Sequence, residues 1–222
     1  MAEIVGQRPG AADEESGGAE LIGPERLIYF SDAVIAIAIT LLALELPVPE
    51  EGVHGNSGVL HFLREHLAEY VAFLISFTVV AVHWLAHQRL FRYARGLVGG
   101  VIQGNLLWLL MIVLMPFTTK LLTSEADAFQ VQFILYAADQ ALAGLFLLLT
   151  FRGLRRAGLL RATASSEVID STLTWMTAMV VTFCLSIPVA LVTHWASLSW
   201  LALPVVRAAL RLVARRGADV RA

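Results

Sequence analysis

A charged and polar cluster opens the first long apolar segment of the chain. Arg26, Ser31 and Asp32 belong to the stretch RLIYFSDAVIAIAITLLALEL, which is as long as a membrane-crossing helix. A charged side chain close to hydrocarbon is costly unless it faces water or the protein interior, so ionisable residues in such segments commonly mark ion or proton pathways. The cluster therefore predicts a membrane protein whose first helix has a polar role.

Two histidines in a later apolar segment have the spacing of metal ligands. His83 and His87 are four residues apart, as in zinc sites on one helix face, and Asp32 could complete the site of an intramembrane hydrolase. The His-Glu-x-x-His signature is absent, however, because Trp84 stands where the general base would be. We therefore favour two hydrogen-bonded histidines in a polar network, and we expect neither a bound metal nor an enzyme activity.

The composition indicates an integral membrane protein. Hydrophobic residues make up 58% of the 222 residues, charged residues make up 15%, and the mean hydropathy is +0.72, far above what a soluble domain needs for its core. The net charge of −2 says little about partners by itself. No stretch of basic residues interleaved with aromatic residues suggests a nucleic-acid partner. Cys184 is the only cysteine, so an intrachain disulfide is excluded.

Six apolar segments are long enough to cross a bilayer, at roughly 20 residues per helix. The hydropathy and the polar breaks place them at about residues 26–47, 65–88, 100–121, 131–151, 170–192 and 195–214. The predicted fold is thus all-α, a polytopic membrane protein with six transmembrane helices per subunit in one domain, residues 26–216. Residues 1–25, which lack the features of a signal peptide, are predicted to be a disordered cytoplasmic tail, and residues 217–222 a second cytoplasmic tail.

The basic residues alternate between the two ends of these segments. The positive-inside rule assigns to the cytoplasmic side Arg8, Arg26, Arg89, Arg92, Arg95, Arg152, Arg155, Arg156, Arg161, Arg207, Arg211, Arg215, Arg216 and Arg221. Only Arg64 and Lys120 fall on the other side. Both termini are then cytoplasmic, which requires an even number of spans and agrees with six. We expect a multi-pass protein of the cell membrane whose arginines contact lipid headgroups.

This orientation places several polar side chains at one depth, near the cytoplasmic side. The residues expected to share this layer are Arg26, Ser31, Asp32, His83, His87 and Asn105. Such groups are costly alone in a low-dielectric setting and tolerable as a network, so we expect Asp32 to accept hydrogen bonds from a histidine or from Arg26. Ser31 and Asn105 would supply further bonds. Asp32 could also cap its own helix, a role that is compatible with the network.

Beyond Asp32, bulky apolar residues follow one face of the first segment. Ile37, Leu41 and Leu44 are spaced i, i+4 and i+7, and Thr40 lies beside them. In an arbitrary membrane helix such a stripe faces lipid or packs against a neighbouring helix. An apolar pore constriction requires the same kind of stripe, so the spacing alone leaves both interpretations open.

Several motifs of the chain resemble one family. RLIYFSD is similar to the Arg-x-x-x-Phe-Ser-Asp signature in the first helix of the transmembrane protein 175 family of potassium channels. AIAITLLALEL, HWLAHQRLFR and the combination of Asn105 with MPFTTKLL are also similar to bacterial members. The resemblance extends over the six segments in order and is strongest from Arg26 to Thr119. In the last two segments it rests on length and hydropathy alone.

The resemblance implies a homotetrameric potassium channel. Bacterial members assemble four six-helix subunits, and the second Phe-Ser-Asp motif of the two-repeat animal relatives is absent here. In the family, the first helices line a central pore. Its narrowest ring maps to Ile37, and the next layers map to Thr40, Leu41 and Leu44. No Thr-Val-Gly-Tyr-Gly sequence is present, so a carbonyl-lined filter is not expected.

The remaining polar residues receive expected roles as well. Arg26, Phe30, Ser31 and Asp32 of the signature are expected to hold the pore helix against the second and third helices. Glu45, near the outer end, would form a ring of carboxylates that attracts cations or would be a surface charge at headgroup level. The expected partners are further copies of the chain and membrane lipid. No cofactor is expected, and potassium would be the permeant ion.

A proton-coupled secondary transporter is the alternative function. It would use the layer of Asp and His side chains together with Asp139, which lies within an apolar segment. Inverted repeats with broken helices would favour such a carrier, and the two halves of the sequence show no convincing similarity of this kind.

Overall fold

The structure is a computed structural model that describes residues 23–124, 126–163, 165–193 and 195–219, with side chains described as far as Leu212. Its helices are α1 (Glu25–Leu44), α2 (Gly55–Glu65), α3 (Leu67–Phe91), α4 (Gly99–Leu122), α5 (Phe129–Arg156), α6 (Ser166–Ala190), the 3-10 helix η1 (Ala196–Ala202) and α7 (Leu203–Asp219). Within the described residues, the only extended pairing is an isolated bridge between Ala94 and Leu160. The predicted all-α class is confirmed.

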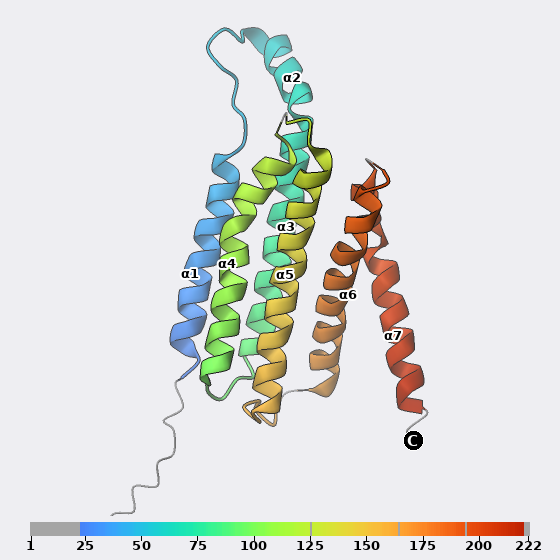
Figure 1. The fold of residues 1–222 in the computed structure, drawn as a ribbon. Coiled ribbons are helices and arrows are strands. Elements are labelled where there is room, and N and C mark those ends of the chain that lie inside the picture. Colours follow the sequence, from blue (N-terminus) through green and yellow to red (C-terminus); the bar gives the residue numbers. More distant parts are fainter. Residues whose placement is uncertain (1–22, 125, 164, 194, 220–222) are drawn as a thin grey trace, which may run out of the picture.

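The long helices lie side by side in one elongated bundle (Figure 1). Helix α1 lies at one edge and packs against α3 and α4, and α5 packs against both α4 and α6. Helix α7 lies at the opposite edge, against α6. The short α2 lies at the end of the bundle where α3 begins, and the first turn of α1 and the last turn of α7 lie at the other end.

Apolar side chains between the helices form two cores. The larger core joins α1, α3, α4 and α5 and contains the fully buried Trp108 and Phe151. The second core joins α5 and α6 through Phe133 and Phe183. Trp200 of η1 packs on both of these rings, with centroid distances of 5.2 and 5.5 Å. The turn between α6 and α7 is thereby anchored to the bundle.

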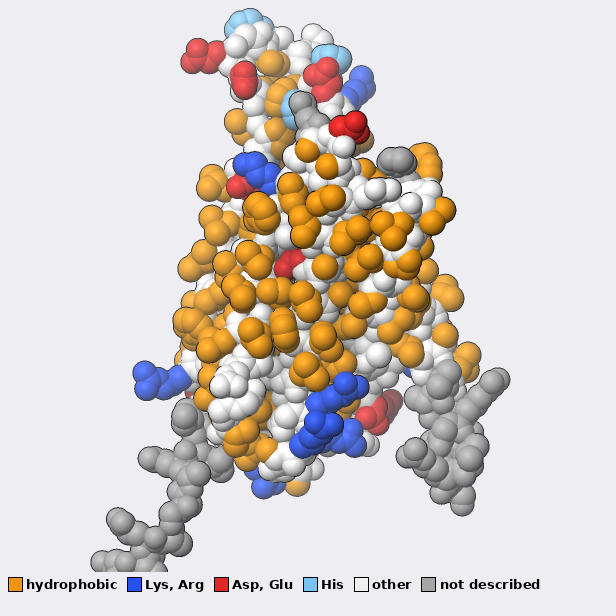
Figure 2. Space-filling view, viewed as in Figure 1, with side chains coloured by type: hydrophobic (Ala, Val, Ile, Leu, Met, Phe, Trp, Pro, Cys, Tyr) orange, Lys and Arg blue, Asp and Glu red, His pale blue; other side chains and the backbone are white. Residues whose placement is uncertain are grey.

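An apolar band covers the middle of the molecule in Figure 2, and lysine and arginine side chains gather below it, at the end where α1 begins. Among the described residues, five helices are long and apolar enough to cross a membrane: α1, α3, α4, α5 and α6. This distribution is that of a multi-pass membrane protein.

Two elements differ from the segments expected from hydropathy. The polar connection after α1 contains α2, a helix without a buried residue, and α3 starts directly afterwards at Leu67. The segment expected at 195–214 is divided into η1 and α7. Helix α7 has 17 residues and carries Arg207 and Arg211, so it is not among the five apolar helices, and a sixth span remains a prediction.

The two predicted tails lie largely outside the described residues. This applies to residues 1–22 and 220–222. Glu25, the last residue of the predicted N-terminal tail, is the first residue of α1. Helix α7 continues to Asp219, past the predicted boundary at residue 216.

Gly104 allows α4 and α5 to approach each other. A Cβ atom at this position would collide with Oγ1 of Thr150 and would lie 3.5 Å from the Cα atom of the same residue. The Thr150 hydroxyl is fixed by donating to the carbonyl oxygen of Phe146 at 2.8 Å. Gly100, one turn earlier in α4, has no atom within 4 Å of a Cβ built there. A side chain is therefore excluded at residue 104 and tolerated at residue 100.

We expect Gly104→Val to destabilise the bundle by about 1–3 kcal/mol, the usual cost of overpacking. The measurement is thermal unfolding of the purified protein in detergent, with Gly100→Val as the matched control. Equal melting temperatures for the two variants would contradict the close contact between α4 and α5.

Candidate functional site

Helix α1 has one buried and one exposed face. Ser31, Ile35, Ala38 and Leu42 recur every three or four residues and are buried on the side that packs against α3 and α4. This spacing is that of a single helix face. The buried face therefore sets which residues point the other way.

The opposite face carries the predicted apolar stripe. Ile37 is 60% exposed, Leu41 42% and Leu44 78%, and Thr40 is exposed as well. The Thr40 hydroxyl donates to the carbonyl oxygen of Ile37 at 2.8 Å, so its own oxygen remains available to a ligand. Within the described part of the chain, no other helix covers this stripe. Its role as a constriction remains a prediction, because a single chain contains no closed ring.

A directed hydrogen-bond chain connects the three helices behind the stripe. The Ser31 hydroxyl of α1 donates to the Leu27 carbonyl at 2.8 Å and accepts from the Asn105 amide of α4 at 3.0 Å. The Asn105 oxygen then faces Nε2 of His87 in α3 at 3.0 Å, so Nε2 must be the donor. All three side chains are buried. The predicted meeting of these three residues is present in the fold.

Aromatic rings enclose the two histidines. The His87 ring stacks on Trp108 with a centroid distance of 4.6 Å and on Phe91 at 4.3 Å. Nε1 of Trp108 is a pure donor and lies 3.3 Å from Nδ1 of His83, which therefore accepts. The second nitrogen of each histidine has no hydrogen-bond partner among the described residues. Both imidazoles are thus parts of the helix packing.

The partners of Asp32 differ from those expected. Its carboxylate accepts from Nε1 of Trp84 at 2.9 Å and from Nε2 of Gln88 at 2.6 Å, and not from a histidine or from Arg26. The reason is the direction of the helix faces: Trp84 and Gln88 form one face of α3, whereas His83 and His87 form the adjacent face, toward α4. Asp32 also lies two turns inside α1, which begins without a side-chain cap, so the capping alternative is wrong.

Two residues of the signature lie outside this contact region. Arg26 is exposed, and Phe30 is 51% exposed. Among the described residues, neither side chain has a hydrogen bond or an ion pair. Within one chain, Ser31 and Asp32 are the residues of the signature whose side chains bond α1 to its neighbouring helices.

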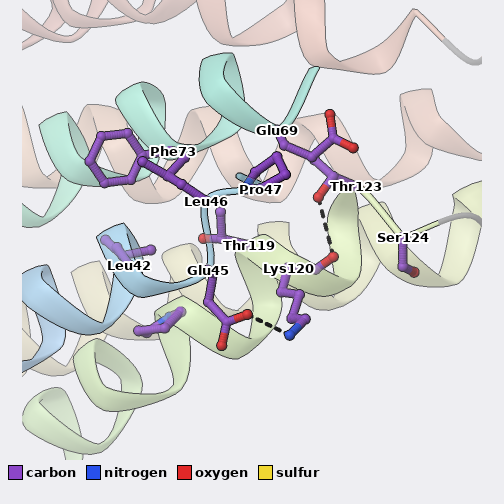
Figure 3. Close-up of a pocket in the computed structure, with 11 residues that line it drawn as sticks. Leu42, Glu45, Leu46, Pro47, Glu69, Phe73, Thr119, Lys120, Thr123 and Ser124 are labelled. Carbon is purple, nitrogen blue, oxygen red and sulfur yellow. Dashed lines mark hydrogen bonds and ion pairs between the residues drawn. The ribbon is translucent and has the colours of Figure 1, made fainter. Parts of the chain in front are cut away.

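A groove with an ion pair lies at the other end of α1. Glu45 and Lys120 are 2.5 Å apart and line an open cavity of about 260 Å³ between α1, α3 and α4 (Figure 3). Both side chains remain more than one third exposed, so the pair contributes little stability. The pairing matters for function, because Lys120 offsets the negative charge that the sequence assigns to Glu45. Within one chain Glu45 is therefore paired, and the expected ring of four carboxylates remains a prediction.

A second buried polar cluster contains Asp139 of α5. Oδ2 of Asp139 accepts from the Thr118 hydroxyl and from the Gln140 amide, both at 3.2 Å. Oδ1 of Asp139 and Oε1 of Gln140 are buried without a partner among the described residues. In a neighbouring group of hydroxyls, Thr119 donates to Ser76 at 2.8 Å, and Ser76 lies 3.1 Å from the hydroxyl of Tyr136. This cluster packs between helices and does not reach the exposed face of α1.

The arrangement does not fit the metal-site hypothesis. Within the described residues, no three His, Cys, Asp or Glu side chains lie close enough to share a metal ion. His83 and His87 contact Trp108 and Asn105, and Asp32 is bound by other residues. The contacts of this site therefore orient a helix and leave an apolar stripe exposed.

Four residues of the site were not found from the sequence. They are Trp84, Gln88, Trp108 and Lys120. The spacing could have predicted three of them. Trp84 and Gln88 are four residues apart and share one face of α3, and Trp108 follows Asn105 by three residues on one face of α4. Lys120 gave no such signal, because its partner lies 75 residues away in the chain.

Known proteins match the segment that carries this site. Residues 26–116 match the family described as the endosomal/lysosomal potassium channel TMEM175. A potassium channel of Streptomyces collinus is 36% identical over 97 residues, which make up 44% of this chain and 46% of that protein. A potassium channel of Chamaesiphon minutus is 38% identical over 97 residues, 44% of this chain and 48% of that protein. The match thus spans about half the length of these relatives.

The fold extends the similarity beyond that segment. The crystal structure of a homologue of the lysosomal potassium-selective channel TMEM175 from Chamaesiphon minutus superposes with a TM-score of 0.66 and 26% sequence identity. The superposition covers 85% of this chain and 96% of that one. The matched residues include α1 with its stripe, α3 with its histidines and the part of α4 that holds Asn105 and Trp108. The resemblance found in the sequence is thereby confirmed: residues 26–116 match the TMEM175 family, and the fold is similar to that of a TMEM175 homologue.

Proposed function

We propose that this chain is one subunit of a homotetrameric, potassium-permeable cation channel whose pore is lined by α1. The observation that carries the proposal is the exposed stripe of Ile37, Leu41 and Leu44 on a helix whose other face is buried against α3 and α4 and is hydrogen-bonded to both helices. Relatives that match this segment are named potassium channels, which is not a class of enzyme. Four copies of α1 would place four stripes around one axis.

The constriction would select ions through the cost of removing their water. An apolar ring of four Ile37 side chains offers no ligand in place of lost water, so each ion pays a dehydration penalty there. Potassium holds its water less tightly than sodium and is penalised less, which predicts a modest preference for potassium. The outward oxygen of Thr40, one turn further along, would add partial coordination and sharpen that preference.

The hydrogen bonds behind the stripe would keep the pore helix in one orientation. Ser31 joins α1 to α4 through Asn105, and Asp32 joins it to α3 through Trp84 and Gln88. These contacts lie on the side away from the stripe, so they position the pore surface without contacting the ion. No cofactor enters this mechanism; potassium is only the permeating ion.

The proposed channel lies in the cell membrane with both termini in the cytoplasm. The arginine-rich end of the bundle would face the cytoplasm, as the positive-inside rule requires, and lipid would surround the apolar band. A proton-coupled transporter built on Asp139 and the histidines is the competing function. A carrier would give saturable flux coupled to pH, whereas a channel gives a current that reverses at the potassium potential.

Ile37→Asn tests the constriction. We expect this variant to conduct several-fold better and to lose most of the potassium preference, because the amide supplies ligands to either ion. The measurement is the reversal potential of purified protein in liposomes under opposed potassium and sodium gradients.

The matched control is Ile75→Asn, which places the same amide at another exposed position, on α3. It should keep the wild-type selectivity. Unchanged permeability ratios in the Ile37 variant would remove this residue from the pore, and pH-coupled, saturable flux in the wild type would favour the carrier.

Lys120→Gln tests the charge at the outer end. We expect roughly twofold higher potassium conductance at low ionic strength, since the variant unmasks the Glu45 carboxylate, and no gain at high salt, where the charge is screened. Glu45→Gln should not raise the conductance. Arg64→Gln, which removes an unpaired charge at the same end, is the control. An equal increase in that control would contradict the role of the pair.

Asn105→Leu tests the link between α1, α3 and α4. The leucine keeps the volume but leaves His87 and Ser31 unpaired, so we expect a loss of about 1–3 kcal/mol in stability and a smaller tetramer fraction. Thermal unfolding and size-exclusion chromatography measure the two effects. Asn56→Leu, at an exposed position of α2, is the matched control. Wild-type stability of the Asn105 variant would show that the link is dispensable.

A further inference from the structure

A groove between α3, α6 and α7 lies at the arginine-rich end of the bundle, away from α1. It has a volume of about 200 Å³, and Arg89, Arg207, Ser171 and Trp175 contribute to its lining. A second groove of about 540 Å³ shares Arg207 and Trp175 with the first and adds Arg211. Arg207 and Trp175 therefore border both grooves.

Positively charged arginine side chains lie close together at this groove, and among the described residues no acidic side chain pairs with them. Arg89 and Arg211 lie near enough to Arg207 for their charges to act on it. The Arg207 guanidinium lies over the Trp175 ring, 4.7 Å from its centre, and its buried Nε atom has no hydrogen-bond partner among the described residues. No ion pair of the described residues includes any of these arginines, and Asp170, the nearby carboxylate of α6, lines a separate groove.

Arg89 and Arg207 line the groove, and Arg211 lines its neighbour; like charges this close are unfavourable unless an anion binds between them. Arginine guanidinium groups match the oxygens of a phosphate in geometry as well as in charge. Stacking on Trp175 keeps Arg207 in place, which lowers the entropy lost when an anion binds. The groove thus has the chemistry of a phosphate site.

The remaining lining distinguishes a lipid from a free phosphate. Val82 and Leu85 of α3 border the groove on the side of the apolar band, and Leu85 is 44% exposed. An acyl chain would cover these side chains, whereas a free phosphate would leave them bare. Arginine and tryptophan are also the residues that lie at the headgroup level of membranes.

We propose that this groove binds one anionic phospholipid of the cytoplasmic leaflet. Its phosphate lies between Arg89 and Arg207, with Ser171 beside them, and one acyl chain follows Val82 and Leu85. The bound lipid would join α7 to α3, two helices that the bundle otherwise connects through α6. This site is independent of the proposed pore and does not require the chain to conduct ions.

The test measures lipid binding to the full chain by native mass spectrometry in detergent, with phosphatidylglycerol and phosphatidylcholine as the two probes. We expect phosphatidylglycerol to bind more tightly than phosphatidylcholine, and Arg89→Gln/Arg207→Gln to weaken phosphatidylglycerol binding about tenfold. The matched control is Arg152→Gln/Arg156→Gln, which removes two exposed arginines at the same end of the molecule, outside the groove.

Each outcome has a fixed meaning. Equal binding of the two lipids, or an equal loss in the control variant, would overturn the proposal. Competition by millimolar inorganic phosphate as strong as that by the lipid would overturn the lipid assignment and indicate a free phosphate instead. If the double variant does not fold, Arg89→Gln alone decides the matter, because Arg89 is exposed and should be removable without a loss of stability.

Discussion

The orientation of α1 depends on one constraint: a polar group buried among membrane helices has no water and must find its partner within the protein. Asn105 satisfies this constraint for three helices at once, since it donates to Ser31 of α1 and accepts from His87 of α3. Turning α1 by a single residue, about 100°, would break this chain. The buried bonds therefore decide that Ile37 and its neighbours face outward.

More exposed polar contacts also join both ends of α1 to its own subunit. Asp32 binds α3 near one end, and Glu45 pairs with Lys120 of α4 at the other. Beyond the helix, the hydroxyl of Tyr70 donates to the carbonyl of Pro47 at 2.8 Å and holds the following connection against α3. A helix held at both ends presents a constant surface between them, which is what an interface shared by several copies needs.

The two edges of the bundle differ in how their polar groups are satisfied. At the α1 edge, the polar side chains around Asp32 and Glu45 find partners inside the chain. At the α7 edge, Arg207 lies over an aromatic ring and forms no ion pair among the described residues, and the arginines that act on it have the same sign of charge. The first edge is suited to contacts between copies of the protein, and the second to an anionic component of the membrane.

The sequence by itself determined the membrane class, five of the six expected apolar helices, and the apolar stripe at Ile37 as one face of a helix, because hydropathy and helical periodicity are properties of residues close in the chain. Only the tertiary structure decided that Asp32 binds Trp84 and Gln88, that Glu45 meets Lys120, and that residues 196–219 form η1 and α7. Which side chains can form a hydrogen bond depends on how two helices are rotated about their axes and on how far along the membrane normal each one lies. Packing across the whole bundle sets this rotation and this position, and no single segment does.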